Sequence, residues 1–388
     1  MARMARRVES FGTTIFTEIN ERARVAGAIN LGQGRPDFDG PAAVVAAARA
    51  AMGREGVHQY PPGNGIPELR QALAAHHGSR YGLAIDPERG ALVTPGATEA
   101  VFCAIMGLVD PGDEVIVIEP YFDSYVPGLV MAGSTPVFVP LRGDDWRLDP
   151  AELRAAVTPR TRALILNTPH NPSGRVLSAT ELADIAAVCR EHDLTVISDE
   201  VYEHLTFDDA VHIPIATLPD MAARTVTIGS AGKTFGMTGW KVGWVLGPEP
   251  LLDGVRRAHQ FVSFSTNHPA QWAVAHGFSL PESHFHDNRA LYARKRDLLL
   301  HGIRAAGLHA ATPQGAYFVV ADFSAVYDGD DAAFARHLID RCGVACIPPS
   351  AFYSPGHRHL AHHLARFSFC KHDATLEQAA TRLQRLHD

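Results

Sequence analysis

A lysine that could form an imine lies in a glycine-rich stretch between two apolar runs. The stretch at residues 230–243 contains Ser230, Lys233 and Lys241, and apolar residues precede and follow it. Burial in such a corner lowers the pKa of a lysine and leaves a neutral amine available for imine chemistry. The alternative is that both lysines are surface residues beside a glycine turn. We therefore treat Lys233 as the candidate reactive amine.

Acidic, amide and basic side chains follow or interrupt other apolar runs. Asp199 closes the run at residues 195–198, and a buried carboxylate at such a place needs a partner. Asn171 lies between two prolines that stiffen the backbone. Arg366 lies in an alternating strand, where an arginine usually binds a carboxylate through two hydrogen bonds. The ordinary alternatives are a capping aspartate, a simple turn and an arginine that faces solvent.

Two further places suit a flat ligand that carries a phosphate. Ala97 and Thr98 begin a predicted helix after the strand at residues 91–94, and the exposed N–H groups of a helix start suit an anion. Tyr121 follows another strand, where an aromatic ring can stack on a flat cationic ring. An ordinary N-cap and a core aromatic residue are the alternatives.

In their order and spacing these motifs resemble the class I/II aminotransferases, enzymes of fold type I that use pyridoxal 5′-phosphate (PLP). The resemblance covers essentially the whole chain and is nearest to the group of kynurenine–glutamine, methionine and N-succinyldiaminopimelate aminotransferases. It implies that Lys233 holds PLP as a Schiff base and that Asp199 pairs with the pyridine nitrogen. It also implies the remaining cofactor contacts: Ala97, Thr98, Ser230 and Lys241 at the phosphate, Tyr121 on the ring face, and Asn171 and Tyr202 at the phenolic oxygen.

The same resemblance implies substrate contacts and a second subunit. Arg366 would bind the α-carboxylate of the substrate, with Gly34 and Asn171 also in contact with the substrate. Tyr60 would reach the phosphate of a neighbouring subunit, which requires a homodimer whose active sites are shared across the interface.

The chain departs from the family at two positions. The commonest family pattern has arginine where this chain has Lys241, which keeps the positive charge but loses the bidentate fork. Arg35 stands where close relatives often have an aromatic residue. If its loop faces the substrate, Arg35 would favour a polar or acidic side chain, and Phe16 and Tyr121 are further candidates for that pocket. Placement of Arg35 on the surface is the alternative.

The elements that position these residues follow from an alternation of short apolar runs and helical stretches between residues 91 and 246. Several runs are apolar throughout, as expected for parallel strands covered on both faces. Ligands of such sheets bind beyond the carboxyl ends of the strands. The predicted strands lie at residues 91–94, 114–118, 136–139, 163–167, 195–198, 225–228 and 242–246.

The last part of the chain predicts a smaller α+β unit, which the N-terminal segment joins. A long charged helix after Pro281 links it to the sheet. We therefore predict the α/β fold class of fold type I PLP transferases, with a large PLP-binding domain at residues 45–280 and a small domain from residues 1–44 and 281–388. The other predicted helices lie at residues 41–52, 67–77, 249–277, 332–341 and 374–386, and the small-domain strands at residues 317–321, 344–347 and 366–369.

Composition limits the remaining possibilities. The 388 residues are 46% hydrophobic and 20% charged, which is the composition of a globular protein. A net charge of −7 gives no general attraction for nucleic acid, and no apolar run approaches the roughly 20 residues that span a bilayer. Five cysteines in mostly apolar surroundings favour the reducing cytoplasm. We expect no metal, since Cys342 and Cys346 lack a second pair and the histidine-rich residues 357–363 lack an accompanying carboxylate.

The expected reaction is a ping-pong transamination from an L-amino acid to a 2-oxo acid, with Lys233 as general base and acid. Candidate donors are methionine, glutamine, aromatic amino acids and N-succinyl-LL-diaminopimelate. β-Elimination and amino-acid oxidation on the same machinery are the enzymatic alternatives. An effector-binding module of a transcription regulator would need an N-terminal DNA-binding domain, whereas the aminotransferase pattern begins by about residue 14.

Overall fold

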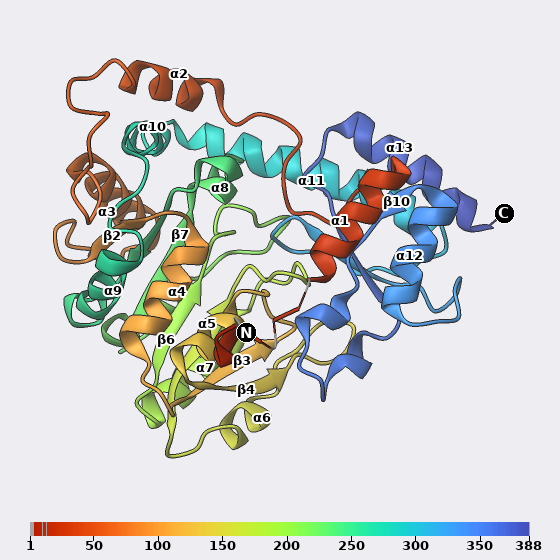
Figure 1. The fold of residues 1–388 in the computed structure, drawn as a ribbon, viewed down its shortest axis with the longest axis horizontal. Helices are drawn as coiled ribbons and strands as arrows, with labels where there is room; N and C mark the ends of the chain where they lie inside the picture. The colour runs from red at the N-terminus through yellow and green to blue at the C-terminus, as the bar shows by residue number, and fades with distance from the viewer. Residues whose placement is uncertain (1–3, 10, 13, 388) are drawn as a thin grey trace.

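All seven predicted strands between residues 91 and 246 form one sheet in the computed structural model, which describes residues 4–9, 11, 12 and 14–387. The strand order is β2-β8-β7-β6-β5-β3-β4 (Figure 1). The neighbours from β4 to β7 are parallel, and β8 is antiparallel to both of its neighbours. The strands are β2 (Ala91–Thr94), β3 (Glu114–Glu119), β4 (Thr135–Pro140), β5 (Thr161–Asn167), β6 (Thr195–Asp199), β7 (Thr225–Ser230) and β8 (Gly243–Leu246).

Strand β8 reverses direction because its connection to β7 is short. That connection contains only the one-turn helix α8 (Ala231–Thr234) and the 3-10 turn η4 (Thr238–Trp240). A parallel neighbour would need a longer crossover that packs across a face of the sheet. The predicted sheet, mostly parallel, is therefore confirmed, and Lys233 lies on the tight connection.

Helices cover both faces of the sheet, which explains why its strands are apolar on both sides. Val115 and Val117 of β3 pack in one cluster with α4, α5 and α9, whereas Ile116 between them packs in a second cluster with α6 and α7. A third cluster joins β2 and β8 to α2, α3 and α10. These helices are α2 (Ala42–Ala51), α3 (Pro67–Tyr81), α4 (Ala97–Leu108), α5 (Tyr125–Ala132), α6 (Pro150–Ala155), α7 (Ala179–Glu191), α9 (Glu249–Val262) and α10 (His268–Gly277).

The prediction of one helical stretch at residues 249–277 is wrong in one respect, because the chain breaks between α9 and α10. Phe264 in the break has a φ of +67°, which a continuing helix does not allow. Asn267 then caps α10 by accepting a hydrogen bond from the backbone N–H of Ala270, and a proline occupies the first turn. The motif Asn267-His268-Pro269 is a helix-start signal that the sequence contains.

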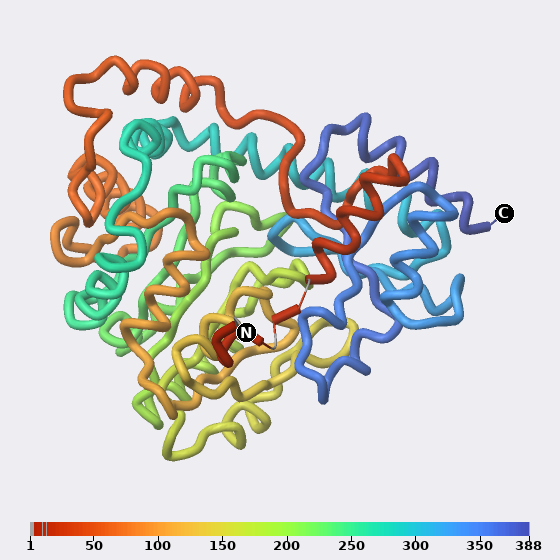
Figure 2. The backbone as a smooth tube through the Cα atoms, viewed as in Figure 1, coloured from red at the N-terminus to blue at the C-terminus, as the bar shows by residue number. Residues whose placement is uncertain are grey.

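The two ends of the chain pack together in a smaller unit, as expected. Strand β1 (Ile29–Asn30) pairs in parallel with β10 (Val344–Ala345), and β9 (Phe318–Asp322) pairs antiparallel with β11 (Leu364–Ser368). Figure 2 shows the first helix beside the C-terminal segments. The helices of this unit are α1 (Ile15–Ala26), α12 (Asp331–Cys342) and α13 (Asp373–Leu383). Residues 1–3, 10 and 13 of the predicted small domain, and residue 388, lie outside the described residues.

The long predicted helix connects the two units. Helix α11 (Glu282–Ala305) packs Phe285 in the cluster with α2, α3 and α10, and Leu299 and Ile303 in the core formed by the two chain ends. The exact domain boundaries at residues 44/45 and 280/281 stay a prediction. No helix of the described residues has the length and apolar character needed to cross a bilayer. The 3-10 helices besides η4 are Arg6–Val8, Ile215–Thr217, Ala222–Arg224, Pro349–Phe352, Arg358–Ala361 and Gln384–His387.

Candidate active site

Side chains at the carboxyl ends of β5, β6 and β7 meet at one cavity. Asn167, Asp199 and Ser230 are the last residues of these strands, and parallel strands end at the same edge of a sheet. The start of α4 and the one-turn helix α8 complete the wall. Of the predicted site residues, the wall contains Ala97, Thr98, Asn171, Asp199, Tyr202, Ser230, Lys233 and Lys241.

One end of the cavity suits an anion. Helix α4 begins directly after Gly96, and no side chain caps its first N–H groups. Gly96 has a φ of +82°, and a Cβ there would lie 3.3 Å from Nζ of Lys241, so that the ammonium group sits beside the helix start. Ser230 contributes a hydroxyl to the same wall. Uncapped N–H groups, a helix dipole, a hydroxyl and an ammonium together fit a phosphate group.

The candidate reactive amine belongs to a chain of hydrogen bonds. Lys233 donates from Nζ to the hydroxyl of Tyr317 at 2.7 Å, and that hydroxyl donates to the carbonyl of Gly34 at 2.7 Å. Burial lowers the pKa of Lys233 from 10.5 to about 8, although the carboxylate of Asp199 opposes the shift. A substantial fraction of the amine is therefore neutral near pH 8, as an imine-forming lysine requires.

Tyr317 is a functional candidate that the sequence prediction missed. It begins a predicted apolar strand and lies just before β9, so its local signal was that of a core residue. Its position next to Lys233 depends on packing between the two units. Gly34 is brought into the same chain of contacts through its backbone carbonyl.

The buried carboxylate at the end of β6 has two donors. Tyr125 donates its hydroxyl hydrogen to Oδ2 of Asp199 at 2.5 Å, and the N–H of Val201 donates to Oδ1 at 3.3 Å. Burial raises the pKa of Asp199 to about 6, and the hydrogen bond from Tyr125 works against that rise. At neutral pH this carboxylate is mostly ionised in a low-dielectric wall, where it favours a cationic partner.

Asn167 holds the next loop in place beside Asp199. Its Nδ2 donates to the backbone carbonyl of Asp199 at 2.8 Å, and its Oδ1 accepts from the backbone N–H of Asn171 at 2.8 Å. Both Asn167 and Tyr125 were missed as site residues. Asn167 was within a predicted strand, and its role as a bridge depends on the neighbouring strand.

The buried guanidinium of Arg366 lies behind Asn171. It donates to Oδ1 of Asn171 at 3.0 Å and to the carbonyl of Gly32 at 2.7 Å, while Nε has no partner. Burial lowers the pKa of Arg366 to about 10, and no carboxylate of the described residues forms an ion pair with it. A buried cation with a free donor suits an incoming carboxylate. Three rings surround it, at 4.2, 4.8 and 5.5 Å from their centroids: Phe318, Phe352 and Phe16.

The aromatic wall of the cavity differs from the prediction by one residue. Phe122 lines the cavity, whereas Tyr121 stacks on Phe138 with ring centroids 5.7 Å apart and is not part of the wall. The expectation that Tyr121 covers a bound ring stays a prediction, and Phe122 is a second candidate for that role because it lines the cavity. Tyr202 does line the cavity, and its buried ring meets Tyr317 edge-on at 5.1 Å.

Two predicted residues lie away from the cavity. Tyr60 is 83% exposed and packs edge-on against the partly exposed Phe264. Arg35 has an exposed side chain, and its backbone carbonyl accepts a hydrogen bond from Lys371. Phe16, in contrast, does approach the substrate-binding candidate Arg366.

The histidine-rich residues 357–363 do have a carboxylate beside them, so that part of the prediction is wrong. Nδ1 of His357 contacts Glu119, the last residue of β3, which also accepts from the backbone N–H of Ser354. The side-chain groups with metal-ligand spacing in the described part of the chain lie elsewhere. They are His76 with Glu203 and His204, and Glu99 with Cys103 and His259.

Comparison with known proteins agrees with this site. The family Aminotransferase class I and II matches residues 26–383. A probable N-succinyldiaminopimelate aminotransferase of Mycobacterium tuberculosis is 47% identical over 385 residues, covering 97% of each chain. Mouse kynurenine–oxoglutarate transaminase 1 is 42% identical over 409 residues, covering 98% of this chain and 96% of that protein.

The fold agrees as well. The solved structure of an Escherichia coli protein with methionine aminotransferase function superposes with a TM-score of 0.94 at 38% identity, covering 99% of this chain and 100% of the other. The cavity lined by Lys233, the buried Asp199 and the uncapped start of α4 thus occurs within the architecture of these enzymes. The chain belongs to the class I and II aminotransferase family and is a PLP-dependent aminotransferase of fold type I.

Proposed function

We propose that Lys233 holds PLP covalently in the cavity at the carboxyl ends of β5, β6 and β7. The supporting observation is that an amine with a pKa of about 8 shares this cavity with a buried carboxylate and an uncapped helix start. Ser230, Lys241 and the first residues of α4 would bind the phosphate. Asp199 would pair with the pyridine nitrogen, and Phe122 would cover the ring.

When bound, PLP supplies a ring that withdraws electrons from the substrate Cα. Asp199 keeps the pyridine nitrogen protonated, because an ionised carboxylate in a buried wall stabilises a cation. Lys233 would accept the proton from the substrate Cα with its neutral Nζ. Tyr317 receives a hydrogen bond from Nζ and is anchored on Gly34, so it orients the amine.

Asn171 and Tyr202 would contact the phenolic oxygen of the cofactor. Oδ1 of Asn171 accepts from Arg366, which leaves Nδ2 as a donor toward the cavity. Burial raises the pKa of Tyr202, so its hydroxyl keeps its proton at neutral pH and can donate. The two donors lie on separate loops, and both line the cavity.

The substrates of the proposed reaction are an L-α-amino acid and a 2-oxo acid. Arg366 would bind the α-carboxylate that both share, through the donor that now lacks a partner. N-Succinyldiaminopimelate is a candidate donor on the basis of the mycobacterial relative, an aromatic amino acid on the basis of the mouse relative, and methionine on the basis of the E. coli structure. Glutamine remains a further candidate.

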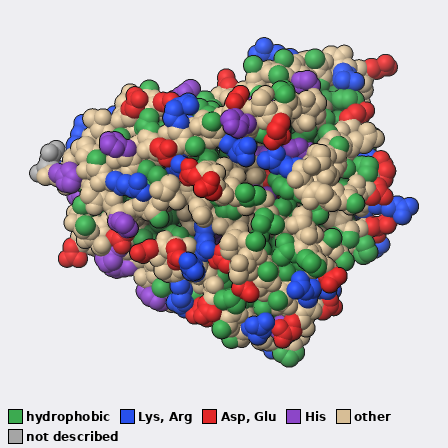
Figure 3. Space-filling model, turned by 180° about the vertical axis from the view of Figure 1, so that it is seen from behind, with side chains coloured by type: hydrophobic (Ala, Val, Ile, Leu, Met, Phe, Trp, Pro, Cys, Tyr) green, Lys and Arg blue, Asp and Glu red, His purple; other side chains and the backbone are tan. Residues whose placement is uncertain are grey.

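A homodimer and a cytoplasmic location are also part of the proposal. Tyr60 and Phe261 expose 83% and 90% of their surface, and large exposed aromatic residues favour a protein interface. Cys103, Cys189, Cys346 and Cys370 are buried and form no disulfide, which agrees with a reducing compartment. Figure 3 shows acidic and basic side chains interspersed over one face, without the basic stripe typical of nucleic-acid binding.

A donor panel tests the reaction. The purified holoenzyme is mixed with each candidate donor and 2-oxoglutarate, and amino-group transfer is measured together with pyruvate and ammonia. We expect transfer with at least one donor, with little pyruvate or ammonia. Release of pyruvate and ammonia without transfer would show β-elimination instead, and absence of transfer from the whole panel would contradict the proposed substrates.

A further inference from the structure

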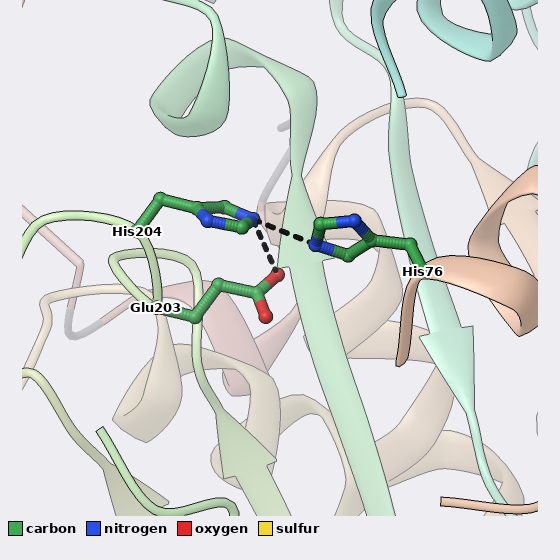
Figure 4. Close-up of side chains that lie close together, drawn as sticks. All are labelled: His76, Glu203 and His204. Atoms are coloured by element: carbon green, nitrogen blue, oxygen red, sulfur yellow. Dashed lines mark hydrogen bonds and ion pairs between the residues drawn. The ribbon is translucent and has the colours of Figure 1, made fainter. Parts of the chain in front are cut away.

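Three side chains converge between helix α3 and the segment that follows β6. Figure 4 shows His204 and Glu203 from that segment and His76 from α3, with their polar atoms pointing toward one another. Nε2 of His76 lies 3.1 Å from Nε2 of His204, and Nε2 of His204 lies 3.7 Å from Oε1 of Glu203. In tetrahedral zinc sites with bonds of 2.0–2.1 Å, neighbouring ligand atoms are about 3.3 Å apart. The spacing of the three groups is therefore that of ligands around one ion.

The carboxylate of Glu203 needs a positive partner. Glu203 is 3% exposed, and its Oε2 is buried without a hydrogen-bond partner in the described part of the chain. No lysine or arginine of that part forms an ion pair with it; its ion-pair contacts are with imidazoles. A carboxylate that is buried without a cation is strongly disfavoured, because it loses its hydration and gains no opposite charge.

His77 is a further neighbour of this carboxylate. Its Nδ1 lies 3.0 Å from the carbonyl of Leu73, and its Nε2 lies 3.6 Å from Oε2 of Glu203. A fourth nitrogen or oxygen ligand is therefore within reach of the group of His76, Glu203 and His204.

Aromatic rings cover both histidines of the group. Phe285 stacks on His204 at 4.6 Å, and Phe278 packs on His76 at 4.9 Å, which keeps water away. Neutral imidazoles and a carboxylate are the donor set that Zn²⁺ prefers.

The second group with metal-ligand spacing, Glu99 with Cys103 and His259, is held together by hydrogen bonds. Oε1 of Glu99 accepts hydrogen bonds from Cys103 and Ser263 and contacts Nδ1 of His259 at 2.7 Å. Nε2 of His259 contacts the carbonyl of Gly63 at 3.1 Å. Hydrogen bonds within the chain thus occupy Oε1 of Glu99 and both nitrogens of His259, while Oε2 of Glu99 is buried without a partner in the described residues. This group serves as a comparison.

We propose that His76, Glu203 and His204 bind one divalent transition-metal ion of the Zn²⁺ type, with His77 or a water as the fourth ligand. The ion would neutralise the buried carboxylate and tie α3 to the segment that begins at Asp199. Its role is structural, because the group lies outside the cavity that contains Lys233. It would stabilise the loop that carries Tyr202 rather than take part in amino transfer.

Metal analysis of the holoenzyme tests the proposal. Protein purified from zinc-supplemented medium without a histidine tag is dialysed and analysed by mass spectrometry for zinc. We expect about one zinc per chain, and a melting temperature that falls on treatment with a strong chelator and returns with added ZnCl₂. Cobalt substitution of the wild type should give visible d–d absorption at longer wavelength than the cofactor, which needs no variant to fold.

Matched variants locate the ion. His76→Gln and His204→Gln should lose roughly tenfold or more in zinc affinity, as expected for the loss of a ligand, while His204→Cys should retain the ion. His212→Gln is the control, because this buried histidine of the same segment pairs with Glu200 instead. Wild type without zinc and without a change in melting temperature, or zinc that persists equally in both glutamine variants, would overturn the proposal. In that case a proton or a water lies beside Glu203.

Discussion

The segment that follows β6 supplies side chains to two buried polar groups with very different surroundings. Asp199 and Tyr202 line the cavity of Lys233, whereas Glu203 and His204 face α3 under a cover of aromatic rings. In both places a buried polar group lacks a complete set of partners within the chain. According to the two proposals, the missing partner is PLP in the cavity and a metal ion in the group of His76, Glu203 and His204.

Substitutions in the two places should therefore affect different properties of the protein, its activity in one case and its thermal stability in the other. Substitutions in the cavity should change activity and leave the melting temperature of the apoenzyme nearly unchanged; the apoenzyme is compared because loss of bound PLP by itself lowers the melting temperature. Substitutions in the group of His76, Glu203 and His204 should do the reverse. Each variant should therefore be measured both by an activity assay and by a thermal melt.

Lys233→Ala should cause the largest effect. Loss of the amine removes both the covalent attachment of PLP and the base for the Cα proton, so the rate of transfer should fall about 10³-fold or more. The variant should lack the visible absorbance of the wild type and should no longer be labelled by borohydride reduction with PLP. A variant that keeps the absorbance would contradict the role of Lys233. A variant whose apo form unfolds at a much lower temperature than the wild-type apoenzyme would remove the distinction between the cavity and the group of His76, Glu203 and His204.

The pH dependence of cofactor uptake should report on the same lysine. Because burial lowers the pKa of Lys233 to about 8 from 10.5, the neutral amine is half formed at about pH 8. The rate at which the apoenzyme takes up PLP should therefore rise about tenfold per pH unit below pH 8 and level off above it. Stopped-flow absorbance between pH 6 and 10 measures this, and a rise that continues to pH 10 would mean an ordinary solvated lysine.

Arg366→Lys should raise KM for every donor about tenfold, because one buried charged hydrogen bond to the α-carboxylate is lost. The change in kcat should be smaller, since no hydrogen bond among the described residues joins Arg366 to Lys233, whose Nζ donates to Tyr317 instead. Steady-state kinetics with two unrelated donors shows whether Arg366 binds the α-carboxylate that all donors share or the side chain of one donor. An increase for only one donor would place Arg366 at the side-chain pocket instead.

Lys241→Arg should have the smallest effect. The guanidinium adds a second hydrogen bond to the phosphate, and PLP affinity should rise severalfold with little change in kcat. Equilibrium dialysis of PLP measures the change. Weaker binding would show that the corner beside Gly96 is shaped for the shorter lysine head group.

The sequence predicted most of the large sheet because its strands carry local signals. Each is a short apolar run with a glycine, proline or polar residue at its end, and the observed bounds differ from the predicted ones by at most two residues. The polar residues at those ends, Asp199 and Ser230 among them, come together because parallel strands share a carboxyl edge. The break between α9 and α10 was missed although Asn267 and a proline mark it.

Contacts between distant residues carried no such signal. Tyr317 and Lys233 are 84 residues apart, and Tyr125 and Asp199 are 74 apart, so neither pair leaves a pattern in a local window. The choice between Tyr121 and Phe122 depends on which of two neighbouring side chains points into the cavity, and this is decided by the packing of Tyr121 on Phe138.

The sequence by itself thus predicted the large sheet and singled out Lys233, Asp199 and Arg366, whose roles stay predictions, because short apolar runs and the polar residues in or beside them are local patterns. Only the tertiary structure decided which tyrosines serve these groups, and only it placed His76 beside His204 across 128 residues of chain. The physical reason is that burial and the distance between ligand atoms are properties of packed elements, and no single segment contains them.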